Sequence, residues 1–351
     1  MRRIVRSEAI CLRVQDYHES SKLVTFFTLE RGKVNCLAKG ARRLRSKFGA
    51  ALDIFAQSRI IYYLRETRDL YTLSDAELVH SFSGLALQPE KFLAAEQMAE
   101  FALRVIQPHD PSPQLYRLLL NYLSTLESLQ DLEAKESRNQ GVKESSARPG
   151  TRILESSTPR PLPEALVCSF LLKAASFLGF RPELRRCLTC RRPIEDQRPA
   201  YFDAGRGGIV CPRCAGEQRD MTGAGHDRNP PGISDRVPSL QERSEGLFPV
   251  FPSLMRLTPA DLDTLSFLLY TPASEIAQVF SAGPQPANVI NRQDPKPDNL
   301  QSPPPPSSAT LQSAVCNLKF PLDLVLGFLG HHFDPLVLNS FRWHARLERG
   351  P

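Results

Sequence analysis

The stretch KVNCLAKGARRLRSKFGAALDIFAQSRIIYYL, residues 33–64, places a Gly-punctuated basic segment between two β-like runs. The run before the basic segment is KVNCLAKG, and the run after it is IFAQSRIIYYL. Both runs contain the β-branched, aromatic and alternating apolar residues that are typical of strands. The stretch therefore predicts two strands joined by a basic loop.

Three further β-like runs flank this pair. The first, SEAICLRVQDY (residues 7–17), alternates between two faces, with Ala9, Cys11 and Arg13 on one and Ile10, Leu12 and Val14 on the other. LVTFFTLE (residues 23–30) follows and leads into a tight turn at Arg31 and Gly32, and DLYTLSDAEL (residues 69–78) comes last. Five short strands with no long helix among them predict a small Greek-key barrel of the OB type over residues 1–80.

Positive charge is concentrated in the same region. Residues 1–80 hold 15 Lys and Arg against 9 Asp and Glu, whereas the rest of the chain holds 29 of each, so the net charge of +6 lies in the barrel. Such an excess is typical of polyanion binding, although a solvated charge run or a localisation tract has the same composition. The candidate DNA contacts are Arg31, Lys33, Lys39, Arg42, Arg43, Arg45 and Lys47, with Phe48 as the candidate for stacking on a base.

After Pro89 the apolar period becomes helical. Residues 89–107, 112–130 and 162–180 predict three helices, and the third is apolar around most of its circumference, as expected at the centre of a bundle. Further helices are predicted over residues 258–270, 318–333 and 335–347. The helical domain thus spans 81–186 and 247–351, with disordered inserts predicted at about 131–161 and 283–308 and a flexible insert at 217–246.

Two CxxC pairs are separated by twenty residues: Cys187 with Cys190, and Cys211 with Cys214. Four thiolates at this spacing can surround Zn²⁺ tetrahedrally, and PAYFDAGRGGIV between them predicts a β-hairpin. A catalytic zinc usually has His or carboxylate ligands and an open position, and neither pair contains such a ligand. A thioredoxin-like redox site is disfavoured because the two CxxC pairs occur together and no βαβ pattern surrounds them. We therefore predict one structural Zn²⁺ in a zinc ribbon over residues 187–216.

The remaining cysteines and histidines indicate no further site. Cys11, Cys36, Cys168 and Cys316 stand singly in apolar surroundings and are expected to be reduced core residues. His331 and His332 are adjacent on a predicted helix, point in different directions, and are expected at a surface or a cap. The chain has neither a signal-peptide-like start nor an apolar run long enough to span a membrane, so a cytoplasmic protein is expected.

The order of these parts resembles the bacterial DNA repair and recombination family RecO, in its zinc-bearing branch. The most specific match is CLAKGARRLRSKFGAALDIF (residues 36–55), which is similar to the basic loop of that family and its flanking strands. The opening residues 7–34 and the CxxC pairs also match, and LGHHFDPLVLNSF (residues 329–341) does so more loosely. The resemblance covers the chain apart from its inserts.

The resemblance implies a non-enzymatic, nucleoid-associated mediator that binds single- and double-stranded DNA and anneals complementary strands. Its implied partners are RecR and single-strand-binding protein, and it would help RecA to load. The implied DNA contacts are Lys39, Arg42, Arg43, Arg45 and Lys47. A nuclease or NTP-driven translocase would need a carboxylate cluster or a phosphate-binding glycine loop, and the sequence shows neither. An RNA-binding or transcription-associated factor built from a barrel and a zinc ribbon stays open as the alternative.

Overall fold

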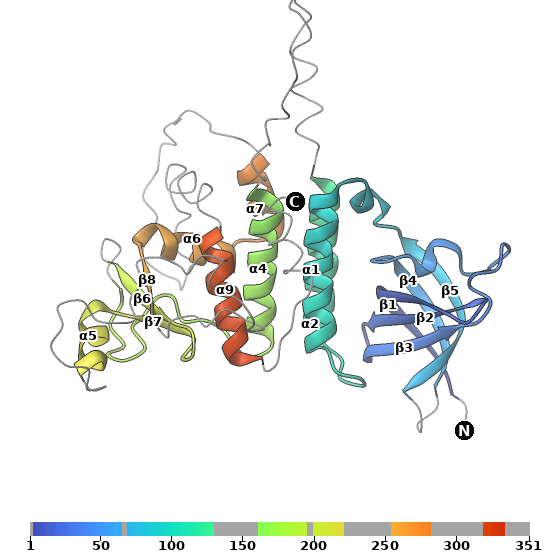
Figure 1. Ribbon diagram of the computed structural model, residues 1–351, viewed down its shortest axis with the longest axis horizontal. Coiled ribbons are helices and arrows are strands. Elements are labelled where there is room, and N and C mark those ends of the chain that lie inside the picture. The colour runs from blue at the N-terminus through green and yellow to red at the C-terminus, as the bar shows by residue number, and fades with distance from the viewer. Residues whose placement is uncertain are drawn as a thin grey trace, which may run out of the picture.

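The computed structural model describes six segments of the chain, residues 3–64, 69–129, 161–194, 199–220, 254–281 and 319–333. Several predictions from the sequence lie outside these residues. They are Cys316, the helix at 335–347, the insert at 283–308, and nearly all of the inserts at 131–161 and 217–246. The described residues form a barrel, a helical bundle and a cysteine-bearing ribbon, with the bundle in the middle (Figure 1).

The N-terminal barrel confirms the predicted OB-like fold. Its strands are β1 (Arg3–Tyr17), β2 (Ser21–Thr28), β3 (Gly32–Ala38), β4 (Gln57–Leu64) and β5 (Leu70–His80). They close in the order β1-β2-β3-β5-β4. The β3–β5 pair is parallel, and the other pairs are antiparallel. The basic segment lies between β3 and β4, as predicted, and includes a short 3-10 helix, η1 (Gly49–Leu52).

Both faces of β1 are buried over residues 9–12, which explains why its sequence is apolar at these successive positions. Ala9 and Cys11 point into the barrel core. Ile10 and Leu12 point outward and belong to the core of the helical bundle, together with Phe27 of β2. The barrel is therefore packed against the helices through one of its walls (Figure 1).

The bundle is built around α4 (Pro161–Phe177), which contacts α1 (Pro89–Val105), α2 (Pro113–Ser128) and the helices that follow the ribbon. Those later helices are α6 (Pro259–Tyr270), α7 (Ala273–Ser281) and α9 (Lys319–His332), and α7 was not predicted. A second 3-10 helix, η2 (Ser83–Leu87), precedes α1. The central position of α4 accounts for its apolar circumference, since neighbouring helices cover most of its sides.

A series of linked hydrogen bonds runs through this apolar bundle. The hydroxyl of Tyr122 is 2.7 Å from Ser169 Oγ, which donates to the carbonyl of Leu268. The Lys173 ammonium donates to the hydroxyl of Tyr122 at 2.9 Å and to the carbonyl of Thr271. Burial lowers the pKa of Lys173 to about 8, opposed by the negative charge of Glu275. These bonds satisfy polar groups that would otherwise be costly to bury.

The ribbon contains the predicted hairpin, β6 (Ala200–Asp203) with β7 (Gly208–Val210), followed by α5 (Pro212–Asp220). A third strand, β8 (Leu254–Leu257), pairs with the other edge of β6. The sequence predicts no strand here: it assigns residues 254–257 to the helical domain and starts the flexible insert at 217, whereas α5 extends to Asp220. Strand pairing across a long sequence separation has no local signal, so the sequence could not reveal it.

Candidate nucleic-acid interface and metal centre

Phe48 anchors the basic loop between β3 and β4 to the barrel. This ring is only 4% exposed and packs in the barrel core. The Lys47 ammonium lies 5.3 Å from its centroid and donates to the carbonyl of Ser74. The prediction that Phe48 stacks on a base is therefore wrong, because the ring is used to hold the loop on the barrel. Lys47 is exposed but is drawn toward β5.

Arg42 holds the other side of the loop. Its Nε lies 3.4 Å from a carboxylate oxygen of Asp16, and its guanidinium donates to the carbonyl of His18 at 3.0 Å. Its backbone N–H donates to the carbonyl of Ser20, also at 3.0 Å. These three interactions join the loop to the end of β1 and to the turn that follows it. Arg42 is therefore partly occupied by contacts within the protein, although its side chain stays exposed.

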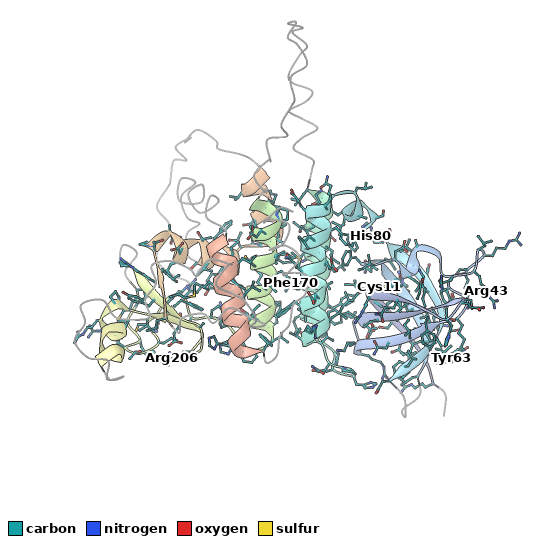
Figure 2. All side chains as sticks on the ribbon, viewed as in Figure 1. Cys11, Arg43, Tyr63, His80, Phe170 and Arg206 are labelled. Atoms are coloured by element: carbon teal, nitrogen blue, oxygen red, sulfur yellow. The ribbon has the colours of Figure 1, made fainter. Side chains whose placement is uncertain are left out.

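Three of the predicted contacts remain available to a ligand. The side chains of Lys39, Arg43 and Arg45 are exposed and make no hydrogen bond or ion pair with the residues that the structure describes. Figure 2 shows Arg43 on the side of the barrel that faces away from the helices. Nothing in the described part of the chain neutralises these charges, so the loop presents a compact cationic surface.

Arg31 and Lys33 lie elsewhere on the barrel. Burial raises the pKa of the Tyr62 hydroxyl, and the nearby Arg31 charge opposes that rise, which places Arg31 beside the tyrosines of β4 and β5. Lys33 faces α1 and donates to the carbonyl of Leu103 at 3.2 Å. Burial, and then the neighbouring charge of Arg104, lower the pKa of Lys33. The predicted basic residues therefore do not form one surface.

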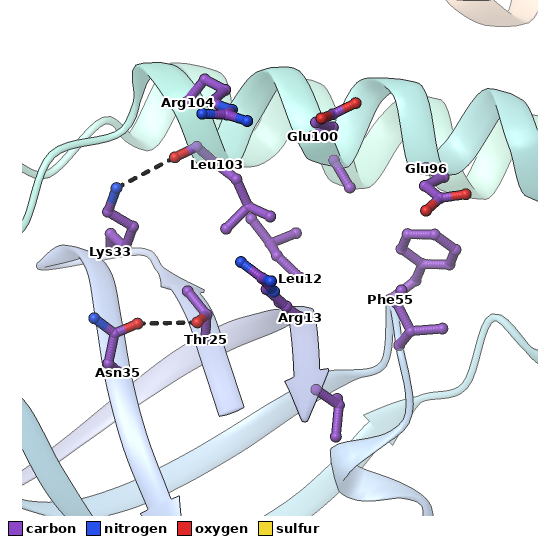
Figure 3. A pocket seen from close by; sticks show the side chains of 13 residues that line it. Leu12, Arg13, Thr25, Lys33, Asn35, Phe55, Glu96, Glu100, Leu103 and Arg104 are labelled. Atoms are coloured by element: carbon purple, nitrogen blue, oxygen red, sulfur yellow. Dashed lines mark hydrogen bonds between the residues drawn. The ribbon is translucent and has the colours of Figure 1, made fainter. Parts of the chain in front are cut away.

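Lys33 lines a cleft of about 800 Å³ between the barrel and α1 (Figure 3). Arg13 from β1 and Arg104 from α1 bring two more cations to it, and Glu96 and Glu100 bring carboxylates. Burial, with the charge of Glu100 as the second cause, raises the pKa of Glu96. The sequence did not reveal this cleft, because no local pattern says which face of α1 meets the barrel.

The four cysteines of the ribbon come together as predicted. Their sulfur atoms all lie within 4.8 Å of one another, and Cys190 Sγ is 3.9 Å from Cys211 Sγ. Sulfurs at ~2.3 Å from a central ion in a tetrahedron are separated by ~3.8 Å, so the arrangement fits a four-coordinate metal ion. Cys187 and Cys190 lie in the turn before β6, Cys211 follows β7, and Cys214 is in the first turn of α5.

Local backbone geometry favours the thiolate form of Cys187. Burial opposes ionisation of Cys187, but backbone N–H groups, including that of Cys211 at 3.4 Å, donate to its sulfur and lower its pKa to about 6. The first turn is closed by the bond from Arg191 N to Cys187 O, with Arg191 at φ +61°. The four cysteines are therefore positioned to hold a metal ion.

The other cysteines and histidines have structural positions. Cys11, Cys36 and Cys168 are buried and form no disulfide bond within the described part of the chain, as predicted, and burial raises the pKa of Cys11 to about 12. His332 lies against the rings of Phe180 and Phe328 at the end of α9, where burial lowers its pKa, and His331 is exposed. None of the helices in the described segments has the length and apolar character required to cross a bilayer.

Comparisons with known proteins agree with this architecture. The family model for the N-terminal part of recombination protein O matches residues 1–82, and the model for its C-terminal part matches residues 86–136 and 153–223. The DNA repair protein RecO of Anaeromyxobacter sp. (strain K) is 32% identical over 211 residues, which cover 60% of this chain and 70% of the relative. The protein of the same name from Cutibacterium acnes is also 32% identical over 211 residues, covering 60% of this chain and 73% of the relative. The chain therefore belongs to the RecO family of DNA repair and recombination proteins.

Proposed function

We propose that the chain is a non-enzymatic recombination mediator that binds single- and double-stranded DNA and anneals complementary strands. Its partners are RecR and single-strand-binding protein, it helps RecA to load, and it acts in the cytoplasm at the nucleoid. The observation that carries the DNA-binding part is the exposure of Lys39, Arg43 and Arg45 on a loop that is held to a rigid barrel. The annealing and loading parts rest on membership of the family.

The loop suits the phosphate backbone better than a particular base sequence. Each arginine can bind phosphate oxygens through its planar guanidinium, and Lys39 adds a point charge beside them. Binding gains free energy from the counterions that the DNA releases. A surface of this kind also lowers the repulsion between two phosphate backbones while leaving base edges free to pair. Annealing then needs no group that makes or breaks a bond.

We further propose that the four cysteines hold one structural Zn²⁺. All four ligands are sulfur atoms of the chain, so the ion has no open position for water or substrate. The two cysteine pairs come from segments on either side of the β6–β7 hairpin, and an ion between them cross-links those segments. Its role is therefore to stabilise the fold of the ribbon.

The experiment is annealing of complementary oligonucleotides coated with single-strand-binding protein, without nucleotide. The wild-type chain should accelerate annealing, and Arg43→Ala/Arg45→Ala should lose most of the acceleration. Arg59→Ala/Arg117→Ala removes the same charge from exposed positions away from the loop and is the matched control. Equal rates for both double variants would contradict the role of the loop. Tighter binding to RNA than to DNA of the same sequence would favour the RNA-binding alternative.

A further inference from the structure

The basic loop carries an apolar side chain at its outer end. Leu44 lies between Arg43 and Arg45 in the sequence, and its relative exposure is 107%, so it gains nothing from packing in the fold. Both neighbouring arginines are also exposed. A leucine that water surrounds completely, between two cations that no described residue neutralises, can bury its apolar surface only against a ligand.

The loop holds this side chain in a defined place. Two tight turns shape it, with Arg43 N donating to Gly40 O at 3.1 Å and Ser46 N donating to Arg43 O at 3.0 Å. Arg42 and the buried Phe48 attach its two sides to the barrel. The entropy lost when the loop binds a ligand is therefore smaller than for a free segment of the same length.

The reach of two residues lets Arg43 and Arg45 address neighbouring phosphates of one strand on either side of Leu44. The Cα atoms of Arg43 and Arg45 are separated by at most about 7 Å, the reach of two residues. Phosphates along a stacked strand advance about 3.4 Å per nucleotide, and a side chain that enters between two bases about doubles that gap. Leucine is among the residues that DNA-bending proteins insert between bases, and unstacking costs least in a single strand.

We propose that Leu44 inserts between adjacent bases of a bound single strand, while Arg43 and Arg45 bind the phosphates on either side. The inference rests on the proposed DNA binding and deepens it. It assigns to Leu44 the contact with bases that the sequence had suggested for Phe48. An unstacked base next to the loop is exposed for pairing, which suits an annealing surface.

The test uses the full chain and a single-stranded oligonucleotide that contains 2-aminopurine, whose fluorescence rises when the base is unstacked. Binding of the wild-type chain should raise the emission. Leu44→Ser should lose that rise while retaining more affinity than Arg43→Ala/Arg45→Ala. Leu44→Met, which keeps a flexible apolar side chain, should retain the rise and is the matched control.

The outcomes separate this inference from the proposed function. An undiminished emission rise with Leu44→Ser would overturn the insertion of Leu44, and DNA binding by the loop would still stand if the arginine variant binds more weakly. If Leu44→Ser loses binding to purified single-strand-binding protein but keeps the emission rise, the insertion of Leu44 between bases is also overturned. Leu44 would then be a contact for a protein partner. If the arginine variant binds as the wild type does, DNA binding by the loop itself is wrong.

Discussion

The ring of Phe27 meets the ring of Tyr116 edge-on, with centroids 5.4 Å apart and planes inclined at 74°. Phe27 comes from the outer face of β2, and Tyr116 comes from α2, so the pair joins the barrel to the bundle. Its neighbour Phe26 points the other way, into the barrel core. Two adjacent phenylalanines thus stabilise two different parts of the protein.

Replacing Phe27 by Ala should therefore lower the free energy of unfolding by about 3–5 kcal/mol, because a large ring is removed from a fully buried site. Urea denaturation followed by circular dichroism measures this. Phe177→Ala is the control, since that ring is 53% exposed and its loss should cost less than ~1 kcal/mol. Equal costs for the two variants would show that the barrel and bundle are not coupled through Phe27.

Gly32 should tolerate no side chain. Its φ is +62°, and a Cβ atom there would collide with the carbonyl oxygens of Gln107 and Asp110 in the connection between α1 and α2. Gly49 has φ +47° but open space around the same position. Gly49→Ala should cost about 1–2 kcal/mol from backbone strain alone. In the same urea denaturation, Gly32→Ala should lower the free energy of unfolding clearly more than Gly49→Ala does. Similar values for the two variants would show that the carbonyl groups facing Gly32 move aside at little cost.

Lys173 should make the free energy of unfolding depend on pH. Its folded pKa of about 8 lies below the ordinary lysine pKa of 10.5, so the unfolded chain binds the proton more tightly. Stability therefore rises with pH between these two values, and the charged lysine costs most below pH 8. Lys173→Met removes this dependence. From pH 7.5 to 9.5 the stability of the wild type relative to this variant should rise by about 1–2 kcal/mol, and parallel profiles would contradict the lowered pKa.

Metal analysis should find one zinc ion per chain. Cys190→Ser should abolish stoichiometric zinc, because a hydroxyl is a poor replacement for a thiolate ligand. Cys36→Ala, which changes a buried cysteine of the barrel, should retain the metal. Removal of zinc by a chelator should increase hydrogen exchange in β6 and β7 while leaving the barrel protected. Full zinc content in Cys190→Ser would contradict the four-sulfur site.

The salt dependence of DNA binding should report how many charges the loop supplies. Each phosphate neutralised on a single strand contributes about −0.7 to the slope of log affinity against log salt, so Arg43→Ala/Arg45→Ala should flatten it by about 1.4. The affinity loss should be alike for all sequences. The matched control is Arg59→Ala/Arg117→Ala, which should keep the wild-type slope. A sequence-dependent loss would indicate base recognition by the arginines instead.

Much of the architecture follows from local patterns. Alternation over residues 7–17 predicted β1, and the spacing of the CxxC pairs predicted the cluster that the structure assembles. The loop was located correctly between β3 and β4, but the stacking role predicted for Phe48 does not fit its buried ring. Periodicity describes regular elements, and a loop has none, so nothing in the sequence showed that Phe48 turns inward while Leu44 turns outward.

By itself, the sequence determined the barrel strands, the apolar centre of the bundle, the position of the basic loop and the identity of the four cysteines that come together in the ribbon. These features depend on residue type and short-range spacing, which the chain carries locally. Only the tertiary structure decided the pairing of β8 with β6, the cleft at Lys33 and the difference between Arg42, which braces the loop, and Arg43, which faces solvent. Those depend on contacts between segments distant in the chain, and such contacts form only when the barrel closes and packs against the helices.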